Sequence, residues 1–290
     1  LSLHDALPIF LYDFESPDVA TDAKSTDLSN FNRTGTLEVV GVGGEYSYSP
    51  DVPPLLAPYA AQSLGMSAVH LRYNTGRHIS ECGRQFAQLL DDLVRVYPAQ
   101  PVELTLIGHS MGGLVISSAC HYGEADQLAW TKSVRRVFYL GSPHQGAPLA
   151  QFGHALTNVL GQVDLPATQI LARILERRSA AVHDMRHAPI VDEHWLSDSP
   201  LAREALPLPH AAHHFVSATM TVDPEHPLGV LMGDLLVRVP SASGPVMSSS
   251  FPIDTSHYGG VMHHELQNHP AVYAQLARLC AVSDAGDVGA

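Results

Sequence analysis

The chain has 290 residues, 45% hydrophobic and 16% charged, a composition typical of a globular protein with ample material for a buried core. The net charge of −13 argues against nucleic acid or an anionic membrane as the main partner, because both attract lysine and arginine. No run in the sequence approaches the ~18 uninterrupted apolar residues of a membrane-spanning helix.

The first residues of the chain need separate treatment. Residues 2–9, SLHDALPI, are what a common sequencing adapter encodes when translated, and we interpret them as a processing scar. The following polar segment has neither helical nor strand periodicity, so residues 1–36 are expected to be scar and disordered tail. The natural protein is expected to be longer at this end. The odd number of cysteines, 3, favours buried thiols and a cytoplasmic location.

Apolar, β-branched runs alternate with helical patterns along most of the chain. Strands are predicted at 37–44, 67–73, 102–107, 134–140 and 213–220, and helices at about 54–64, 80–96 and 270–281. Ser80 is predicted to cap the second of these helices. Nearly continuous apolar strands that alternate with helices indicate an α/β fold with a parallel sheet covered on both faces.

The alternation breaks over residues 147–210, which hold two amphipathic helical stretches and a polar segment. A segment of this kind inside an α/β core is suited to cover a pocket. We therefore expect a first part of the core at 37–146, a helical cap insertion at 147–210 and a second part of the core at 211–290.

The segment LTLIGHSMGGLVISSAC (104–120) places one serine between two apolar runs. Gly108 and Gly112 bracket Ser110 in the pattern G-x-S-x-G, between a predicted strand and a predicted helix. A serine hydroxyl needs a neighbouring base and access to a pocket to act as a nucleophile. A sharp strand-to-helix turn gives that access, the glycines remove clashing side chains, and the Met111 N–H faces a developing oxyanion. The pattern favours Ser110 as a nucleophile.

The segment IGHSMGG resembles the nucleophile elbow of α/β-hydrolase lipases and esterases. The segments LRYNTGRHIS (71–80) and LGSPHQGAPLA (140–150) are similar to a bacterial branch related to GPI inositol-deacylase-like and class 2 lipases, and the similarity spans residues 37–282. The resemblance implies an α/β-hydrolase fold with a mostly parallel central sheet, helices on both faces and a helical cap. It also implies a Ser–acid–His triad in that chain order.

The resemblance places the acid after a late strand. Asp234, in GDLLVRVPSASG, is similar to the acid loop of these lipases. Asp223 and Asp254 are the alternatives, although Asp223 is followed by a proline and Asp254 comes close to the histidine loop.

The family places its histidine in a loop, three residues before a leucine that packs as the last helix begins. His263 has Leu266 at that offset, whereas His264 has Gln267, and His269 is expected at the start of the helix. The predicted base is therefore His263, which would take the proton of the nucleophile while the acid orients its ring.

The second oxyanion donor in the family follows a His-Gly pair at the end of an early strand. Aligned on VVGVGG, this chain has Val40 in place of the histidine, then Gly41, and Val42 as the donor residue. The predicted oxyanion hole is thus made by the backbone N–H groups of Val42 and Met111.

The 18 histidines do not show the spacing of a dedicated metal site, so neither a metal nor another cofactor is predicted. His144 is expected to line the pocket. The sequence predicts a serine hydrolase that cleaves a small-molecule or lipid-like carboxylic ester through an acyl-enzyme. An acyltransferase, a thioesterase or a non-catalytic binding protein on the same scaffold stays open, as does the oligomeric state.

Overall fold

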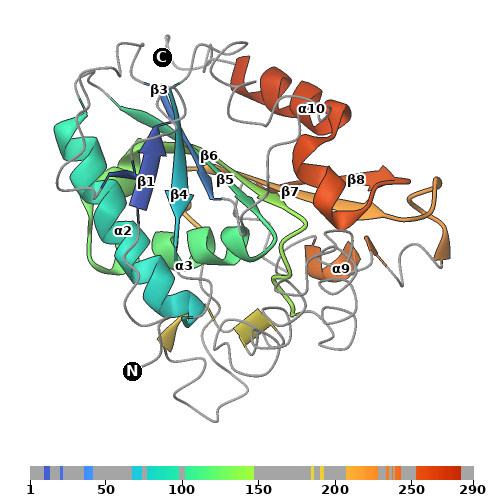
Figure 1. Cartoon of the computed structure of the whole chain (residues 1–290), viewed down its shortest axis with the longest axis horizontal. Coiled ribbons are helices and arrows are strands. Elements are labelled where there is room, and N and C mark those ends of the chain that lie inside the picture. The colour runs from blue at the N-terminus through green and yellow to red at the C-terminus, as the bar shows by residue number, and fades with distance from the viewer. Residues whose placement is uncertain are drawn as a thin grey trace, which may run out of the picture.

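The structure, a computed structural model, describes residues 10–13, 20–21, 36–41, 67–73, 77–97, 102–146, 184–185, 190–192, 207–227, 233–234, 237, 239–242 and 253–281. In this part of the chain, strands form one sheet in the order β2-β1-β4-β3-β5-β6-β7-β8 (Figure 1). The strands are β1 (Phe10–Asp13), β2 (Ala20–Thr21), β3 (Thr36–Gly41), β4 (Ser67–Arg72), β5 (Glu103–His109), β6 (Val134–Leu140), β7 (Ala212–Thr219) and β8 (Ile253–Gly259).

The strands from β4 to β8 in this order, β3 included, all pair in parallel, whereas β1 pairs antiparallel with both β2 and β4. Parallel pairing brings the carboxyl ends of these strands to one edge of the sheet. Ligands of open α/β sheets bind at that edge, because the loops that leave the strands converge there.

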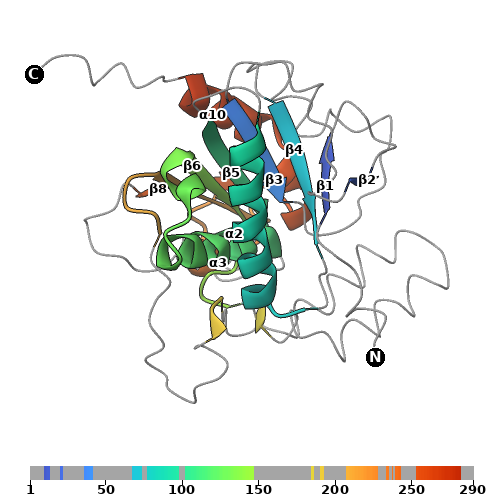
Figure 2. The same cartoon turned by 90° about the vertical axis from the view of Figure 1, so that its left-hand side faces the viewer.

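Helices cover both faces of the sheet. The helical segments among the described residues are α2 (Ile79–Val96), α3 (Met111–Ala125), α9 (Val239–Ala242) and α10 (Pro270–Ala281), with 3-10 turns η4 (Ala129–Ser133) and η5 (His263–Asn268). Helices α2 and α3 pack against each other on one side of the sheet (Figure 2). None of the helices in the described ranges is long and apolar enough to cross a membrane.

Side chains of the central strands alternate between two hydrophobic clusters. Leu106, Tyr139 and Phe215 belong to the cluster that includes α2 and α3, whereas their chain neighbours Ile107 and Phe138 join a second cluster with α10. Successive strand residues point to opposite faces, so each buried strand contributes to both layers. The prediction of apolar strands in a parallel sheet covered on both faces is confirmed.

Most of the predicted elements are present. Strands β4, β5, β6 and β7 and helices α2 and α10 coincide with their predicted segments to within two residues. The helix expected at about 54–64 lies outside the described residues, as does most of the cap expected at 147–210. Strand β8 was not predicted, because its residues are largely polar and only partly buried.

The N-terminal segment differs from the expected disordered tail. Strand β1 follows the proposed scar directly, and its residues Phe10–Asp13 pair with Val69–Arg72 of β4. Strand β2 extends the same edge. The structure thus describes two short strands inside the segment expected to be a tail, where pairing with β4 satisfies the backbone groups of β1.

The start of α2 also differs from the prediction. The N-cap residue is His78, and Ser80 lies buried in the first turn. The side chain of Asp184 takes the capping role, since its Oδ2 accepts a hydrogen bond of 2.9 Å from the Ile79 N–H and lies 3.1 Å from His78 Nδ1. A carboxylate suits a helix N-terminus, where the backbone N–H groups lack partners. The contact holds Asp184, a residue of the 147–210 segment, at the N-terminal end of α2.

The cysteines form no disulfide. Cys82 and Cys120 are buried, and burial raises the pKa of each thiol to about 12. The prediction of buried thiols is confirmed for these two, whereas Cys280 is partly buried.

The contact between α2 and α3 generates a stability prediction. A Cβ atom at Gly83 would lie 2.3 Å from Ser118 Cβ and 2.1 Å from its Oγ. We therefore expect Gly83→Ala to lower the free energy of unfolding by about 1–3 kcal/mol, the usual cost of overpacking, measured by urea denaturation. Adding Ser118→Gly should recover part of the loss, with Ser118→Gly alone as the control. Additive effects of the two substitutions would contradict the predicted contact.

Candidate active site

A sharp turn joins β5 to α3 at Ser110. The strand ends at His109, the helix begins at Met111, and Ser110 between them has a φ of 54° and a ψ of −125°. Residues other than glycine seldom adopt a positive φ, because Cβ then meets the backbone. The Ser110 N–H donates a hydrogen bond of 2.9 Å to the Leu140 carbonyl at the end of β6. The turn is thus strained and is fixed to the neighbouring strand.

Two glycines permit the close approach of the helix to the strands. A Cβ atom at Gly108 would lie 2.5 Å from Gly113 N and 2.7 Å from Gly112 C, and one at Gly113 would lie 2.0 Å from Ser142 Oγ. The predicted need for glycine at position 108 therefore has a direct steric reason. Gly113 was not singled out from the sequence, because its close neighbour Ser142 lies beyond the next strand.

His263 and Asp234 form a buried pair. His263 Nδ1 lies 2.8 Å from Asp234 Oδ2, and the two residues are only 5% and 1% exposed. The other carboxylate oxygen, Oδ1, accepts a hydrogen bond of 2.9 Å from the Val237 N–H. A carboxylate that accepts from Nδ1–H leaves the lone pair of the neutral imidazole on Nε2. This is the tautomer that a general base requires.

The loops after β7 and β8 bring this pair together. The Met220 N–H donates to the Gly233 carbonyl over 3.0 Å, so Asp234 lies just beyond the carboxyl end of β7. The Val261 N–H, after β8, donates to the Thr219 carbonyl over 3.0 Å. The His263 N–H then donates to the Asp234 carbonyl over 3.2 Å, so backbone and side chain both join the two loops.

The Nε2 atom of His263 is buried and makes no hydrogen bond with any described residue. The Nε2 of His144 is unpaired in the same way, so what distinguishes His263 is the buried carboxylate on its other ring nitrogen. An imidazole with one nitrogen held by a carboxylate and the other vacant is arranged to accept a proton.

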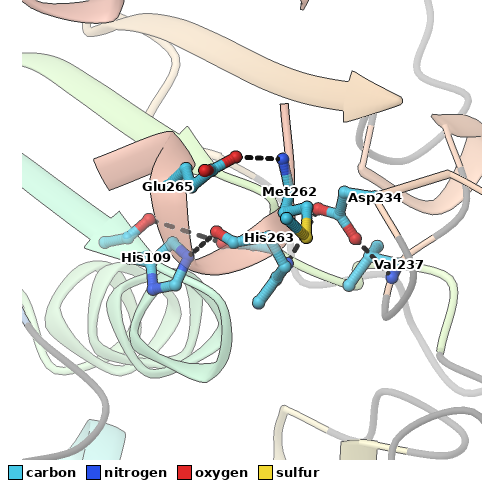
Figure 3. Close-up of polar contacts among 8 residues, drawn as sticks. His109, Asp234, Val237, Met262, His263 and Glu265 are labelled. Atoms are coloured by element: carbon cyan, nitrogen blue, oxygen red, sulfur yellow. Dashed lines mark hydrogen bonds and ion pairs between the residues drawn. The ribbon is translucent and has the colours of Figure 1, made fainter. Parts of the chain in front are cut away.

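His263 lies beside the strained turn. Gly141 directly follows Leu140, which holds the Ser110 N–H, and a Cβ at Gly141 would lie 3.2 Å from both Nδ1 and Cε1 of His263. His109, which precedes the serine, also contacts His263, with its Nε2 2.9 Å from the His263 carbonyl oxygen (Figure 3). The structure therefore brings the three predicted triad residues to one edge of the sheet. Their assignment to catalysis stays a prediction.

The alternative acids have other environments. Asp223 is in an exposed turn, where its Oδ1 accepts a hydrogen bond of 3.0 Å from the Glu225 N–H. Asp254 is the second residue of β8 and pairs with His214 near the start of β7, at the amino ends of these strands. Neither position is suited to orient His263.

The alternative bases belong to the same turn. His264 follows His263 in η5, but its side chain lies outside the described residues. His269 precedes α10, and its Nδ1 accepts a hydrogen bond of 3.3 Å from the Ala271 N–H. His269 is thus a residue of the helix start, as the sequence suggested. Leu266 is fully buried against the α10 face, which fits the offset used to choose His263.

Of the two residues predicted to donate to the oxyanion, the structure describes Met111 and not Val42. Strand β3 pairs with β5 so that Gly41 lies opposite Gly108, and β3 therefore ends beside the serine turn. Val42 itself lies outside the described residues. Met111 is the first residue of α3, where backbone N–H groups have no intrahelical partner.

His144 packs among aromatic side chains of the sheet. The His144 ring packs against Tyr139 and Phe215, with centroid distances of 4.7 and 5.1 Å, and burial lowers its pKa to about 3. The position of His144 in the wall of a pocket stays a prediction. Within the described ranges there is no group of three or more His, Cys, Asp or Glu side chains suited to hold a metal ion.

Comparisons with known proteins agree with this architecture. The fold is that of the α/β hydrolases. Residues 70–225, more than half of the chain, match the family of the PGAP1-like alpha/beta domain, and the protein belongs to this family.

Solved structures are similar in fold. The mature form of the Bacillus licheniformis lipase BlEst2 has a TM-score of 0.55 and 17% identity, with 86% of this chain and 92% of that chain covered. An esterase from Pyrobaculum calidifontis has a TM-score of 0.51 and 14% identity, with 87% and 78% covered. No curated protein matches the sequence.

The strain at Ser110 can be measured. Ser110→Ala and Ser110→Gly both remove the hydroxyl, but only glycine accepts a φ of 54° without a Cβ clash. Relief of about 1–3 kcal/mol of strain should exceed the ~0.4–1 kcal/mol that glycine loses through the unfolded state. Urea denaturation should therefore show Ser110→Gly to be more stable than Ser110→Ala. The opposite order would mean that the turn is not strained.

Proposed function

We propose that the protein is a serine hydrolase that cleaves carboxylic esters through an acyl-enzyme on Ser110. The observation that carries this proposal is the buried His263 Nε2, which has no partner among the described residues while Nδ1 is held 2.8 Å from Asp234. The similarity in fold to a lipase and an esterase supports the same class of reaction.

In the proposed reaction His263 Nε2 removes the hydroxyl proton of Ser110 as Oγ attacks the ester carbonyl carbon. Asp234 holds the ring and stabilises the imidazolium that forms. Collapse of the tetrahedral intermediate breaks the bond to the alcohol oxygen, and His263 returns its proton to that leaving group. A water molecule, deprotonated by the same nitrogen, then attacks the acyl-enzyme, and as the bond between the acyl carbon and Ser110 Oγ breaks, His263 returns the proton to Oγ and the acid is released.

Negative charge develops on the former carbonyl oxygen during both steps. We assign its stabilisation to the Met111 N–H at the start of α3 and to the N–H of Val42, which follows the end of β3. One such donor is worth on the order of 10²–10³ in kcat. The parallel pairing of Gly41 with Gly108 supports this assignment, because β3 then ends opposite a residue two positions before the serine.

The same groups could serve an acyltransferase or a thioesterase, because these reactions differ in the acceptor or the leaving group and not in the nucleophile. Hydrolysis of p-nitrophenyl esters of short and long acids, compared with transfer to added alcohols, separates these activities. A cap over residues 147–210 would favour acyl chains of moderate length over acetate, since apolar walls hold the chain by burial.

The first functional prediction concerns the nucleophile. Ser110→Ala should lower kcat for p-nitrophenyl ester hydrolysis by on the order of 10⁴–10⁶, because the acyl-enzyme route is lost. A fluorophosphonate probe should label the wild-type protein at Ser110 only. The wild-type unfolding transition should be retained by Ser110→Ala. Labelling that persists in this variant would exclude the proposal.

The second functional prediction concerns the base and the acid. His263→Ala should reduce kcat about as strongly as loss of the serine, and Asp234→Asn should reduce it by on the order of 10⁴, because the amide no longer fixes the basic tautomer. His264→Ala is the matched control, with an expected change of less than about threefold, within the small effect of a residue outside the reacting set. A strong defect in His264→Ala together with a mild one in His263→Ala would move the base by one residue.

A further inference from the structure

His109, the last residue of β5, directly precedes the serine turn. It is 3% exposed, and its side chain points to the same face as Ile107, two residues earlier, which packs in the α10 cluster. The proposed reaction assigns no role to this side chain.

His109 makes two contacts with the candidate base. Its Nε2 lies 2.9 Å from the His263 carbonyl oxygen, and because a carbonyl only accepts, this nitrogen carries the proton. The two imidazole rings lie with centroids 4.7 Å apart at an interplanar angle of 41°. The residue before the nucleophile therefore contacts both the backbone and the ring of His263.

We propose that His109 is a positioning residue that fixes His263 relative to Ser110, an inference that rests on the proposed function. With its bond, every polar group of His263 except Nε2 is engaged. The His263 N–H donates to the Asp234 carbonyl, the His263 carbonyl accepts from His109, and Nδ1 is paired with the Asp234 carboxylate. The first and third contacts come from the loop after β7, and among the described residues the bond from His109 links the base to the strand that carries the serine.

This link has a geometric consequence. Ser110 is held by the ends of β5 and β6, whereas Asp234 and His263 lie in loops after β7 and β8. Small shifts of these loops would change the distance from Nε2 to the serine hydroxyl. A displacement of about 1 Å can cost on the order of 10² in rate. A hydrogen bond from His109 makes β5 the common reference for nucleophile and base.

Three substitutions separate the two contacts. His109→Gln keeps an N–H donor at a similar distance from the main chain, His109→Phe keeps the ring without the donor, and His109→Ala removes both. Thr131→Ala, in η4, is the control for the loss of a buried hydrogen bond outside the candidate site. It removes a hydroxyl that donates over 2.9 Å to the Leu128 carbonyl.

Steady-state kinetics with a p-nitrophenyl ester and the rate of fluorophosphonate labelling give the functional readout. We expect kcat and the labelling rate to fall by on the order of 10² in His109→Ala, with KM changed less than about threefold. His109→Gln should recover most of the loss and His109→Phe only a small part. Thr131→Ala should leave kcat unchanged.

Proton NMR of the Nδ1–H between His263 and Asp234 gives a readout that does not require turnover. The resonance should be sharp in the wild-type protein and in His109→Gln, and broadened in His109→Ala by motion of the ring. The free energy of unfolding of each variant is measured by urea denaturation. If all three variants lose kcat equally, in parallel with their losses in unfolding free energy, His109 has only a structural role and the proposal is overturned.

The outcomes separate this proposal from the function on which it rests. If the wild-type protein neither hydrolyses esters nor reacts with the probe, the proposed function fails. If the wild-type protein is active and His109→Ala retains its kcat and its sharp Nδ1–H resonance, only the positioning role is wrong.

Discussion

The close approach of α3 to the ends of β5 and β6 is the constraint on which the candidate site depends. A Cβ atom at Gly108 or Gly113 would overlap atoms of the helix or of Ser142, so this geometry exists only with glycine at both positions. The turn between strand and helix then has a single residue, and Ser110 takes a positive φ. The strain is local, and the hydrogen bond to Leu140 and the packing of α3 hold it in place.

The candidate site also requires that the loops carrying its three side chains meet. The parallel arrangement of the strands brings these loops to one edge of the sheet. Asp234 follows β7, His263 follows β8, and the serine follows β5, so all three leave the sheet at its carboxyl edge. Backbone hydrogen bonds join the β7 and β8 loops before any side chain is considered. The carboxylate of Asp234 can therefore be buried, because both its oxygens have donors. Burial in turn keeps water from competing for His263 Nδ1.

Local sequence patterns predicted those elements whose conformation depends on neighbouring residues in the chain. The G-x-S-x-G segment, the buried strands and α10 each follow from periodicity and from glycine or proline positions within a few residues. The choice of His263 came from a family resemblance, and the burial of Leu266 gives it a packing reason. The cap of α2 was misassigned because its acceptor, Asp184, is 105 residues from Ile79 in the chain. Strands β1 and β8 were not predicted, because both lie in the outer part of the sheet. There, hydrogen bonding to a neighbouring strand determines the conformation more than an apolar pattern in the sequence does.

Three paired histidines show why a histidine-rich composition says little about a site. His213 Nε2 donates a hydrogen bond of 3.0 Å to the Leu208 carbonyl, and its Nδ1 lies 3.3 Å from the Tyr139 hydroxyl. Burial lowers the pKa of this imidazole to about 4. His214 pairs with the exposed Asp254 at the amino ends of the strands, where solvent screens the attraction. Of these three, only His263 combines a buried carboxylate at Nδ1 with an Nε2 that has no hydrogen-bond partner among the described residues. A general base needs one ring nitrogen held and the other without a bond, and in the described part of the chain His263 has this arrangement at the edge of the sheet where the serine turn lies.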